Sequence, residues 1–372
     1  MRSKIALFTV LAASAVIARA AIELDDGIKL VPSLSAGVQF NDNLFLSSAN
    51  EQDETMWTIT PGVAITSGEG AVNSTRFSIA EQFQLYSDNS GLNTNLALVD
   101  LASTYDDGKM KIDLNAWFHQ ANQATRNLAG AASLIDRDLL HGDVMDEVQW
   151  SDKSSVKVGV AYDNTDYKAA GYRDWQWIEV PVKYYYKYQP KLDFSAGVRY
   201  RSNKIGGAGA IDSNELFYSV GARGEITPKL IGEVSVGYIS FDPDAGQSKS
   251  SIGLDSSLTL NVTQKSSLNF AASNRYGYGA VGDSYRIATI SGGFNTALTN
   301  DFFLNGSLAY SKYDYLTSTR QDDFWSGQLS ATYAISHNLS VNGTYNYSNN
   351  DSDLPIATFK NSILALSATF QF

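Results

Sequence analysis

Apolar side chains fall on every second position along most of this chain, and that period of two limits the possible folds more than any other feature. The alternation is clear from Leu34 to Phe40 and from Leu192 to Arg201. It continues to the end, from Leu339 to Tyr347 and from Leu364 to Phe372. Because neighbouring side chains of a strand point to opposite faces, the pattern predicts β-strands with one apolar and one polar face.

We count about eighteen such segments, each close to the length that a tilted strand needs to cross a bilayer. Their connections alternate between two kinds. The short turns include Gln189–Lys191, Thr227–Lys229, Thr263–Lys265, Thr299–Asp301 and Ser336–Asn338. The longer segments include Asn203–Asn214, Asp242–Ser251, Gly277–Ser284 and Ser348–Pro355. Short turns on one side and long loops on the other are typical of outer-membrane barrels.

The predicted fold class is therefore all-β: a transmembrane, antiparallel, up-and-down β-barrel of about 18 strands. A pair of soluble β-sandwiches also alternates, but seldom has so many near-equal strands with alternating loop lengths. No stretch approaches eighteen consecutive apolar residues, which excludes helical membrane spans. Tyrosines near strand ends on the apolar face are expected to form aromatic girdles at the two membrane interfaces. They are Tyr184, Tyr186, Tyr200, Tyr218, Tyr238, Tyr276, Tyr310, Tyr333 and Tyr347.

An apolar stretch near the amino terminus indicates the compartment. Arg2 and Lys4 precede the run Ile5–Ile17, which ends in the small-residue box Ala18–Ala20. The run is too short for a spanning helix, so residues 1–20 are predicted to be a cleaved signal peptide and residues 21–372 the outer-membrane barrel. The chain has no cysteine, which excludes disulfides, thiolate metal sites and cysteine nucleophiles.

The polar face of the predicted strands carries charges of both signs, and these side chains are expected to line the lumen. Neighbouring opposite charges allow lateral ion pairs along the wall. A solvated, internally paired lumen and a polar track for a hydrophilic solute are the two interpretations. The candidate lumen-lining residues are Lys157, Glu179, Lys183, Lys187, Asp193, Arg199, Arg201, Glu215, Arg223, Glu225, Glu233, Asp255 and Arg275.

Several aromatic residues share that inward face and are candidates for stacking on sugar rings. A slip of one residue in register would turn the same side chains towards lipid. The candidate sugar-stacking residues are Trp117, Trp175, Trp177, Tyr185 and Phe217.

The register is less regular between about residues 70 and 150. Glu81 is in phase with Phe77 and Phe83, which places a carboxylate on the lipid face unless a bulge or another register intervenes. The longest connection, Gln120 to Leu140, contains the apolar run Leu128–Leu134. A long connection is often functional, and this one folds into the lumen as a constriction or forms a short surface helix.

The sequence lacks common catalytic motifs, so we expect that the protein is not an enzyme and binds no cofactor. There is no Gly-x-Ser-x-Gly elbow and no His-Glu-x-x-His motif. His119, His141 and His337 are far apart in the sequence. The acidic pairs near Asp242 and Asp351 lack the spacing of a calcium loop. Basic residues are spread singly, which makes nucleic acid an unlikely partner.

Two motifs at the start of the predicted barrel are more specific. The segment Val31–Asn43 ends in Phe-Asn-Asp-Asn, and the next strand carries Thr58–Val63, Thr-Ile-Thr-Pro-Gly-Val. These two motifs resemble the putative β-barrel porin 2 family of outer-membrane proteins. The aromatic carboxyl terminus, Phe372, resembles the closing strand of bacterial outer-membrane β-barrels. The resemblance implies a large barrel, often associated with exopolysaccharide export. Pro61 would remove a ladder donor and is expected to cause a bulge or bend.

Three functions follow from these expectations. The first is a passive conduit for polysaccharide export, which the resemblance favours. The second is a general diffusion porin for small hydrophilic solutes, and the third is a structural or adhesive barrel with a filled lumen. The expected partners are outer-membrane lipid and lipopolysaccharide. If the protein is an export conduit, polysaccharide and periplasmic export components are expected as well.

Overall fold

The computed structural model describes residues 22–25, 27–68 and 70–372, and the predicted signal peptide lies outside these residues. Nearly all of the described chain is strand. The short strand β1 (Ile22–Asp25) precedes eighteen long ones. They are β2 (Ile28–Asn41), β3 (Glu54–Ser67), β4 (Asn73–Tyr86), β5 (Thr94–Asp106), β6 (Met110–Asn122), β7 (Asp136–Ser151), β8 (Ser154–Tyr167), β9 (Trp175–Gln189), β10 (Leu192–Ile205), β11 (Ser213–Thr227), β12 (Leu230–Pro243), β13 (Lys249–Asn261), β14 (Ser266–Tyr278), β15 (Ser284–Ala297), β16 (Phe302–Tyr315), β17 (Gln321–Ala334), β18 (Leu339–Ser352) and β19 (Phe359–Gln371).

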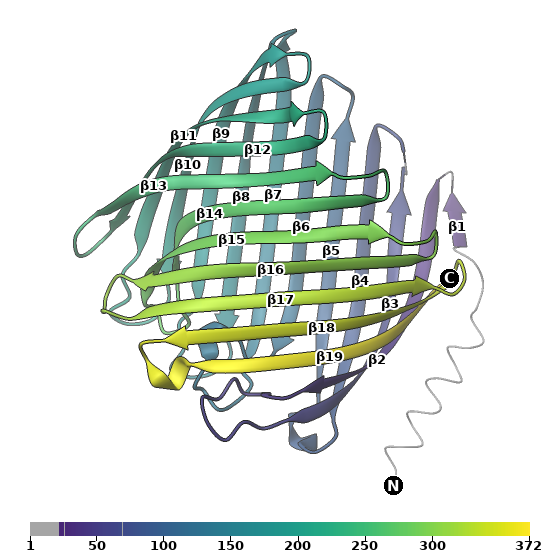
Figure 1. The fold of residues 1–372 in the computed structure, drawn as a ribbon, viewed down its shortest axis with the longest axis vertical. Helices are drawn as coiled ribbons and strands as arrows, with labels where there is room; N and C mark the ends of the chain where they lie inside the picture. The colour runs from purple at the N-terminus through teal and green to yellow at the C-terminus, as the bar shows by residue number, and fades with distance from the viewer. Residues whose placement is uncertain (1–21, 26, 69) are drawn as a thin grey trace.

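Each long strand pairs antiparallel with its sequence neighbour, and β19 closes the sheet by pairing with β2. The closing register places Leu366 opposite Val38 and Phe370 opposite Leu34. Closure leaves the barrel without a continuous free edge, which is how a sheet can sit in lipid. In Figure 1 the front wall, β13–β19, runs across the view, while β4–β8 run up it behind. The predicted antiparallel barrel of about 18 strands is confirmed.

Turns and loops gather at opposite ends of the barrel. The predicted short turns join β9–β10, β11–β12, β13–β14, β15–β16 and β17–β18, next to the carboxyl terminus. The other end, which we call the loop end, carries the long connections and three short 3₁₀ turns, Ser90–Leu92, Arg126–Leu128 and Pro355–Ala357. No helix among the described residues is long and apolar enough to cross a membrane.

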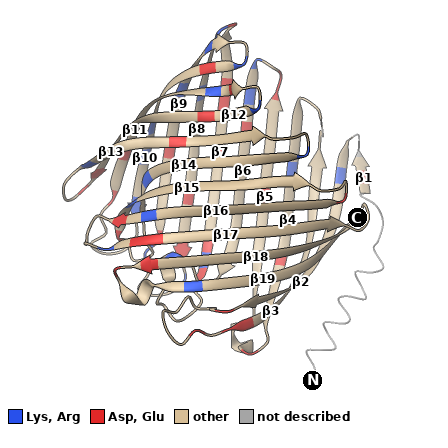
Figure 2. Ribbon diagram, in the orientation of Figure 1, with Lys and Arg blue, Asp and Glu red and all other residues tan. Residues whose placement is uncertain are grey.

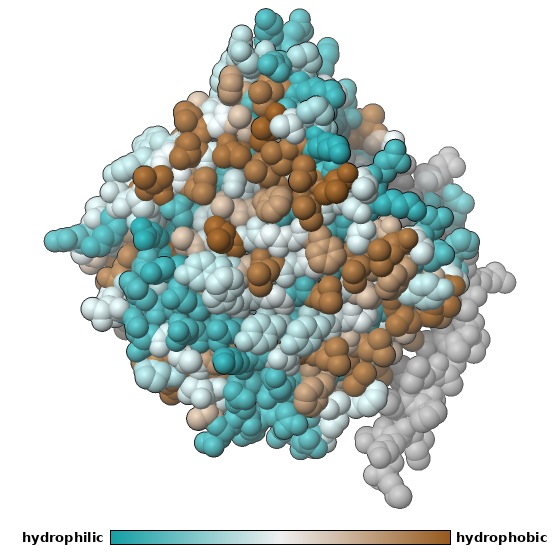
Figure 3. Space-filling view, viewed as in Figure 1, coloured by the Kyte–Doolittle hydropathy of each residue, from teal (hydrophilic) through white to brown (hydrophobic). Residues whose placement is uncertain are grey.

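The outward face is an apolar band. On the front wall, charged residues of β15–β19 lie near the loop end and leave the strand middles uncharged (Figure 2). Hydrophobic side chains cross the same face, with hydrophilic ones towards the loop end (Figure 3). Most of the predicted girdle tyrosines are exposed, for example Tyr218 at 52% and Tyr333 at 51%. Tyr310 is only partly exposed, and Tyr276 is buried, with 3% of it exposed.

Glu81 lies on the outward face without any bulge. The pairing of β3 with β4 keeps one register on both sides of Pro61, from Ile59–Phe83 to Gly62–Ala80. Of the bulge or bend expected at Pro61, the bulge is wrong: Pro61 interrupts the ladder without shifting its register. The amide Nδ2 of Asn95 donates to Oε1 of Glu81 at 2.6 Å, which gives the exposed carboxylate a partner on the next strand.

The barrel wall splits between β13 and β14. Their ladder runs from Asn261–Ser267 only as far as Asp255–Ser273. Beyond this point β13 continues beside β12 to Lys249, and β14 continues beside β15 to Tyr278. Among the described residues, no backbone pairing joins β13 and β14 over this last part. We call this opening towards the loop end the seam.

Candidate functional site

Ion pairs between strands that are not neighbours identify the inner face of the barrel. Nζ of Lys183 on β9 lies 2.6 Å from Oε1 of Glu233 on β12. The guanidinium of Arg223 on β11 reaches Glu147 on β7 at 2.5 Å. It also lies 3.0 Å from Asp193 on the neighbouring strand β10. Strands three or four places apart can meet only across the concave side of a closed sheet. These side chains therefore face the interior and bridge part of its width.

A second group of charges lies nearer the loop end of the same wall. Nη2 of Arg201 donates to Oε2 of Glu179 at 2.5 Å. Arg199 lies 3.5 Å from Glu179, 3.8 Å from Glu215 and 3.3 Å from Asp255. Opposite charges thus neutralise each other along β9–β13, and a solvated lumen with lateral pairs fits this arrangement.

The remaining predicted lumen residues take less connected positions. Lys157 is in register with Glu147 on β7, and Lys187 with Asp193 on β10. Glu225 accepts from Nζ of Lys191 at 2.7 Å, beside the β9–β10 turn. Arg275 is exposed and makes no ion pair within the described chain. Whether any of these residues contacts a solute stays a prediction.

The predicted stacking residues divide into two groups. Tyr185 and Phe217 are 2% and 4% exposed. The guanidinium of Arg223 lies 3.4 Å from the ring centre of Tyr185, and that of Arg199 lies 5.0 Å from Phe217. Neither ring offers a free face to a sugar, so the prediction is wrong for these two residues. Their rings hold arginines in place instead, through cation–π contact.

The three tryptophans are half-buried, and protein groups already lie against them. Trp117 stacks on His119 and His141, with ring centres 4.8 and 5.4 Å apart. The guanidinium of Arg201 lies 4.7 Å from the ring centre of Trp177. Trp175 lies at the loop end beside Tyr278. Sugar stacking on these three rings stays a prediction. The barrel also brings together two of the histidines that are distant in the sequence.

The opposite wall of the lumen is polar but nearly uncharged. On β2–β4 and β15–β19, the residues in phase with the inner face are mostly Ser, Thr, Asn and Gln. They include Ser35, Gln39, Thr58, Thr60, Gln82, Gln84, Thr289, Ser291, Asn305, Ser307, Ser326, Gln328, Asn342, Thr344, Asn346, Asn361 and Ser367. We call this surface the neutral wall. Charges and aromatic residues alone do not predict this wall, although hydroxyls and amides alternate in the sequence from Ser340 to Asn346.

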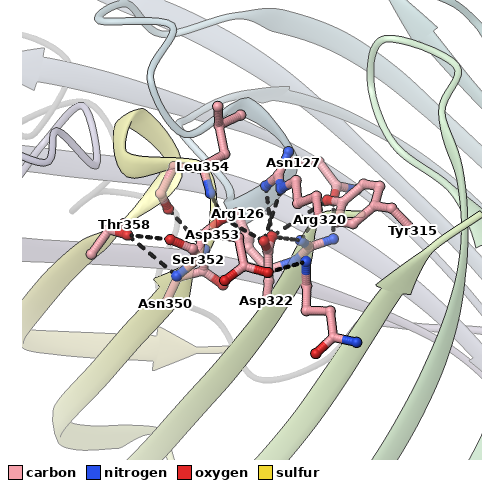
Figure 4. A network of polar contacts seen from close by, with 12 residues as sticks. Arg126, Asn127, Tyr315, Arg320, Asp322, Asn350, Ser352, Asp353, Leu354 and Thr358 are labelled. Atoms are coloured by element: carbon pink, nitrogen blue, oxygen red, sulfur yellow. Dashed lines mark hydrogen bonds and ion pairs between the residues drawn. The ribbon is translucent and has the colours of Figure 1, made fainter. Parts of the chain in front are cut away.

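The loop between β6 and β7, residues 123–135, crosses the loop-end mouth to the opposite wall. Nη1 of Arg126 lies 2.9 Å from Oδ2 of Asp322 and donates to the Tyr315 hydroxyl at 3.1 Å. Its guanidinium also lies 3.4 Å from the ring centre of Tyr313. Figure 4 shows Arg126 meeting Asp322, which Arg320 and Ser352 also contact. Both charged partners are buried.

Apolar contacts support this inward position of the loop. Leu128 and Ile135 pack with Ala280, from the connection between β14 and β15, in one buried cluster. The backbone N–H of Arg173, before β9, donates to the carbonyl of Ala280 at 2.8 Å. Three connections thus meet inside the mouth. Of the two alternatives left open by the sequence, the structure has the loop folded inward rather than lying on the surface.

The interior combines a polar wall with a cavity near the mouth. No group of three or more His, Cys, Asp or Glu in the described residues is placed to hold a metal ion. A cavity of about 400 Å³ lies below the mouth beside the neutral wall, between β2–β4, β19 and the start of the β6–β7 loop. Gln39, Thr60, Gln84 and Asn122 are among its lining residues. The amides and hydroxyls there can exchange hydrogen bonds with water or a neutral solute.

Comparison with known proteins agrees with this architecture. Residues 29–372 match the family described as "Putative beta-barrel porin 2". Among solved structures, OccK2 (OpdF) of Pseudomonas aeruginosa aligns with a TM-score of 0.50 at 7% identity, over 93% of this chain and 97% of that one. A BenF-like porin of Pseudomonas fluorescens Pf-5 gives 0.49 at 8% identity, over 93% and 99%. No curated protein matches the sequence. At such low identities the structural likeness concerns the fold alone.

Proposed function

Because this chain belongs to the putative β-barrel porin 2 family, and so is an outer-membrane β-barrel of the porin type, we propose that it is a passive channel for small, uncharged hydrophilic solutes. Export through a cleaved signal peptide, residues 1–20, is part of the proposal. A diffusion porin was one of the alternatives predicted from the sequence, and it is the function that we propose here.

The neutral wall is the observation that carries this proposal. Its hydroxyl and amide groups replace the hydrogen bonds that a sugar-like solute makes with water. The facing charges are largely paired with one another, for example Lys183 with Glu233 and Arg223 with Glu147. Paired charges attract ions less than isolated ones do. This lumen therefore favours polar solutes without strongly selecting them by charge.

The mouth argues against the export of a polymer. A polysaccharide needs a continuous opening, whereas the loop anchored by Arg126 and the connection around Ala280 meet inside this one. Neither the family match nor the structural neighbours support polysaccharide export. A structural or adhesive barrel fits the buried mouth but leaves the neutral wall without a role.

Solute uptake into vesicles tests the proposal. The purified barrel is reconstituted into liposomes, and swelling is followed with isosmotic arabinose, sucrose and a dextran. We expect swelling with arabinose, a slower rate with sucrose, and none with dextran. Equal rates for all three would favour a polymer conduit, and no swelling together with no ion conductance would favour a filled structural barrel.

A pair of variants connects the result to the neutral wall. Gln328→Leu replaces an amide of this wall by an apolar side chain of similar size, and should slow sugar entry. Leu329→Gln makes the reverse exchange on the outward face of the same strand, where Leu329 is 47% exposed, and should leave the rate unchanged. If both variants swell like the wild type, the neutral wall does not set permeability.

A further inference from the structure

The seam between β13 and β14 is a built feature of the barrel rather than a frayed end. Oδ1 of Asn274 accepts from the N–H of Leu254 at 2.6 Å, at the point where the two strands part. Oε2 of Glu215 on β11 accepts from the N–H of Tyr276 at 3.0 Å. A side chain from three strands away thus satisfies a backbone group that the ladder has released. Buried backbone groups left without such partners are costly.

Beyond the seam, β14 runs beneath the neighbouring wall. Tyr276 and Tyr278 alternate in phase with Phe270, whose side chain is 46% exposed on the outward face. Both tyrosines are nevertheless 3% exposed, because inward-facing residues of β10–β12 cover them. Phe241 stacks on Tyr276 with ring centres 4.5 Å apart and planes 18° from parallel. The two edges of the wall therefore overlap at the loop end.

A cavity of about 470 Å³ lies between these two edges. One side is formed by the β12–β13 hairpin, which reaches out beyond its neighbours at the left of Figure 1. Phe241, Tyr278, Val281 and Leu316 give it an apolar lining. This size and this mainly apolar lining are typical of ligand pockets.

The same cavity also carries charged groups from two connections and from the start of β13. Arg173 and Lys249 supply two cations, and Asp283 supplies one carboxylate. Burial raises the pKa of Asp283, which reduces its charge at a given pH. Oδ1 of Asp283 is buried without a hydrogen-bond partner. The net charge of these three side chains is positive, whereas the net charge of the whole chain is negative.

The seam reaches down to the apolar band of the outward face. Ile252 on β13 is 76% exposed and lies opposite Tyr238, while Leu254 lies opposite Val236. Tyr238 and Val236 are outward and exposed, as expected for an aromatic girdle above an apolar band. A molecule in the outer leaflet can therefore meet the open edge of β13 without entering through the mouth.

We propose that the seam binds a single-chain amphiphile with an anionic head group, taken from the outer leaflet. The tail lies along Phe241, Tyr278, Val281 and Leu316, and the head group lies near Arg173 and Lys249. This site borders the mouth, because Arg173 and the β14–β15 connection belong to both, but it goes beyond the proposed passage of hydrophilic solutes. Its occupancy and the channel's permeability are measured independently, so either can fail alone.

Binding of radiolabelled dodecanoate to the full barrel in zwitterionic nanodiscs is the test. We expect saturable binding in excess of that of empty nanodiscs. Val281→Asp places a second carboxylate in the lining and should weaken binding at least about tenfold, because an unpaired charge is poorly tolerated among apolar groups. Val281 is 57% exposed in a connection, so the substitution is compatible with folding.

Val262→Asp is the matched control, since Val262 is 45% exposed in the β13–β14 turn at the other end of the barrel. It should bind dodecanoate like the wild type. Lys249→Gln should weaken dodecanoate binding about threefold, as expected for one exposed ion pair, and leave competition by dodecanol unchanged. Non-saturable binding, or equal loss in both valine variants, would overturn the proposal.

Discussion

Arg126 is the residue that most directly fixes the state of the mouth. It is buried against Asp322 and Tyr313 although it belongs to a loop that starts on the other side of the barrel. Removing one member of a buried ion pair costs about 3–5 kcal/mol when the other is left alone. Here Arg320 still contacts Asp322 at 2.6 Å, so the cost should fall below that range.

We predict that Arg126→Ala releases the loop and raises single-channel conductance. The same variant should make residues 123–135 more sensitive to limited proteolysis. Arg275→Ala is the control, because Arg275 also lies in phase with the inner face but makes no ion pair within the described chain. Wild-type conductance in Arg126→Ala with a cleaved loop would mean that the loop crosses the mouth without limiting flow.

At the scale of the strands, the seam depends on Glu215. Its carboxylate accepts from the backbone of Tyr276, and the barrel has no other described group that bonds this N–H. Glu215→Ala should therefore destabilise the barrel by about 1–3 kcal/mol, the cost of a buried donor left unpaired. Thermal unfolding followed by circular dichroism or by heat-modifiable gel mobility measures the difference.

Glu215→Gln is the matched variant, because glutamine keeps an acceptor oxygen and a similar volume. It should unfold near the wild-type temperature. Both variants remove the charge that lies 3.8 Å from Arg199, so that contribution cancels between them. Equal destabilisation of the two would assign the effect to the ion pair rather than to the backbone bond.

The sequence predicts the strands well because period two reports directly on which side chains share a face. It also predicts which end carries the turns, since turns need residues such as those of Gln189–Lys191. It does not predict what covers a face. Tyr276 has the parity of a girdle residue, and its burial follows from the inner surface of β10–β12, which no local pattern encodes.

The candidate site was predictable to a similar extent. Parity placed Lys183, Arg223 and Glu233 on one face, and their contacts follow from the closure of the barrel. The anchoring of Arg126 was not predictable, because Asp322 lies 196 residues further along the chain. Burial of Tyr185 and Phe217 under arginines depends likewise on the curvature of the wall rather than on the strands themselves.

For the whole molecule, the distribution of charge between its two ends should govern ion selectivity. Acids outnumber bases in the connections at the loop end. The acids are Asp42, Glu51, Asp53, Asp88, Asp174, Asp212, Asp244, Asp283 and Asp353, and the bases are Arg126, Lys168, Arg173 and Arg320. A negative mouth concentrates cations, and this effect declines as salt shortens the Debye length.

We therefore predict weak cation selectivity in 0.1 M KCl or below, where the Debye length is about 10 Å or more, and its loss near 1 M, where it is about 3 Å. Reversal potentials in KCl gradients measure this. Asp53→Asn with Asp88→Asn, both exposed at the mouth, should reduce the selectivity. Asp152→Asn with Asp301→Asn makes the same charge change in turns at the opposite end and should reduce it less. Selectivity that persists in 1 M KCl would instead point to a charged constriction within the lumen, because close charges are screened least.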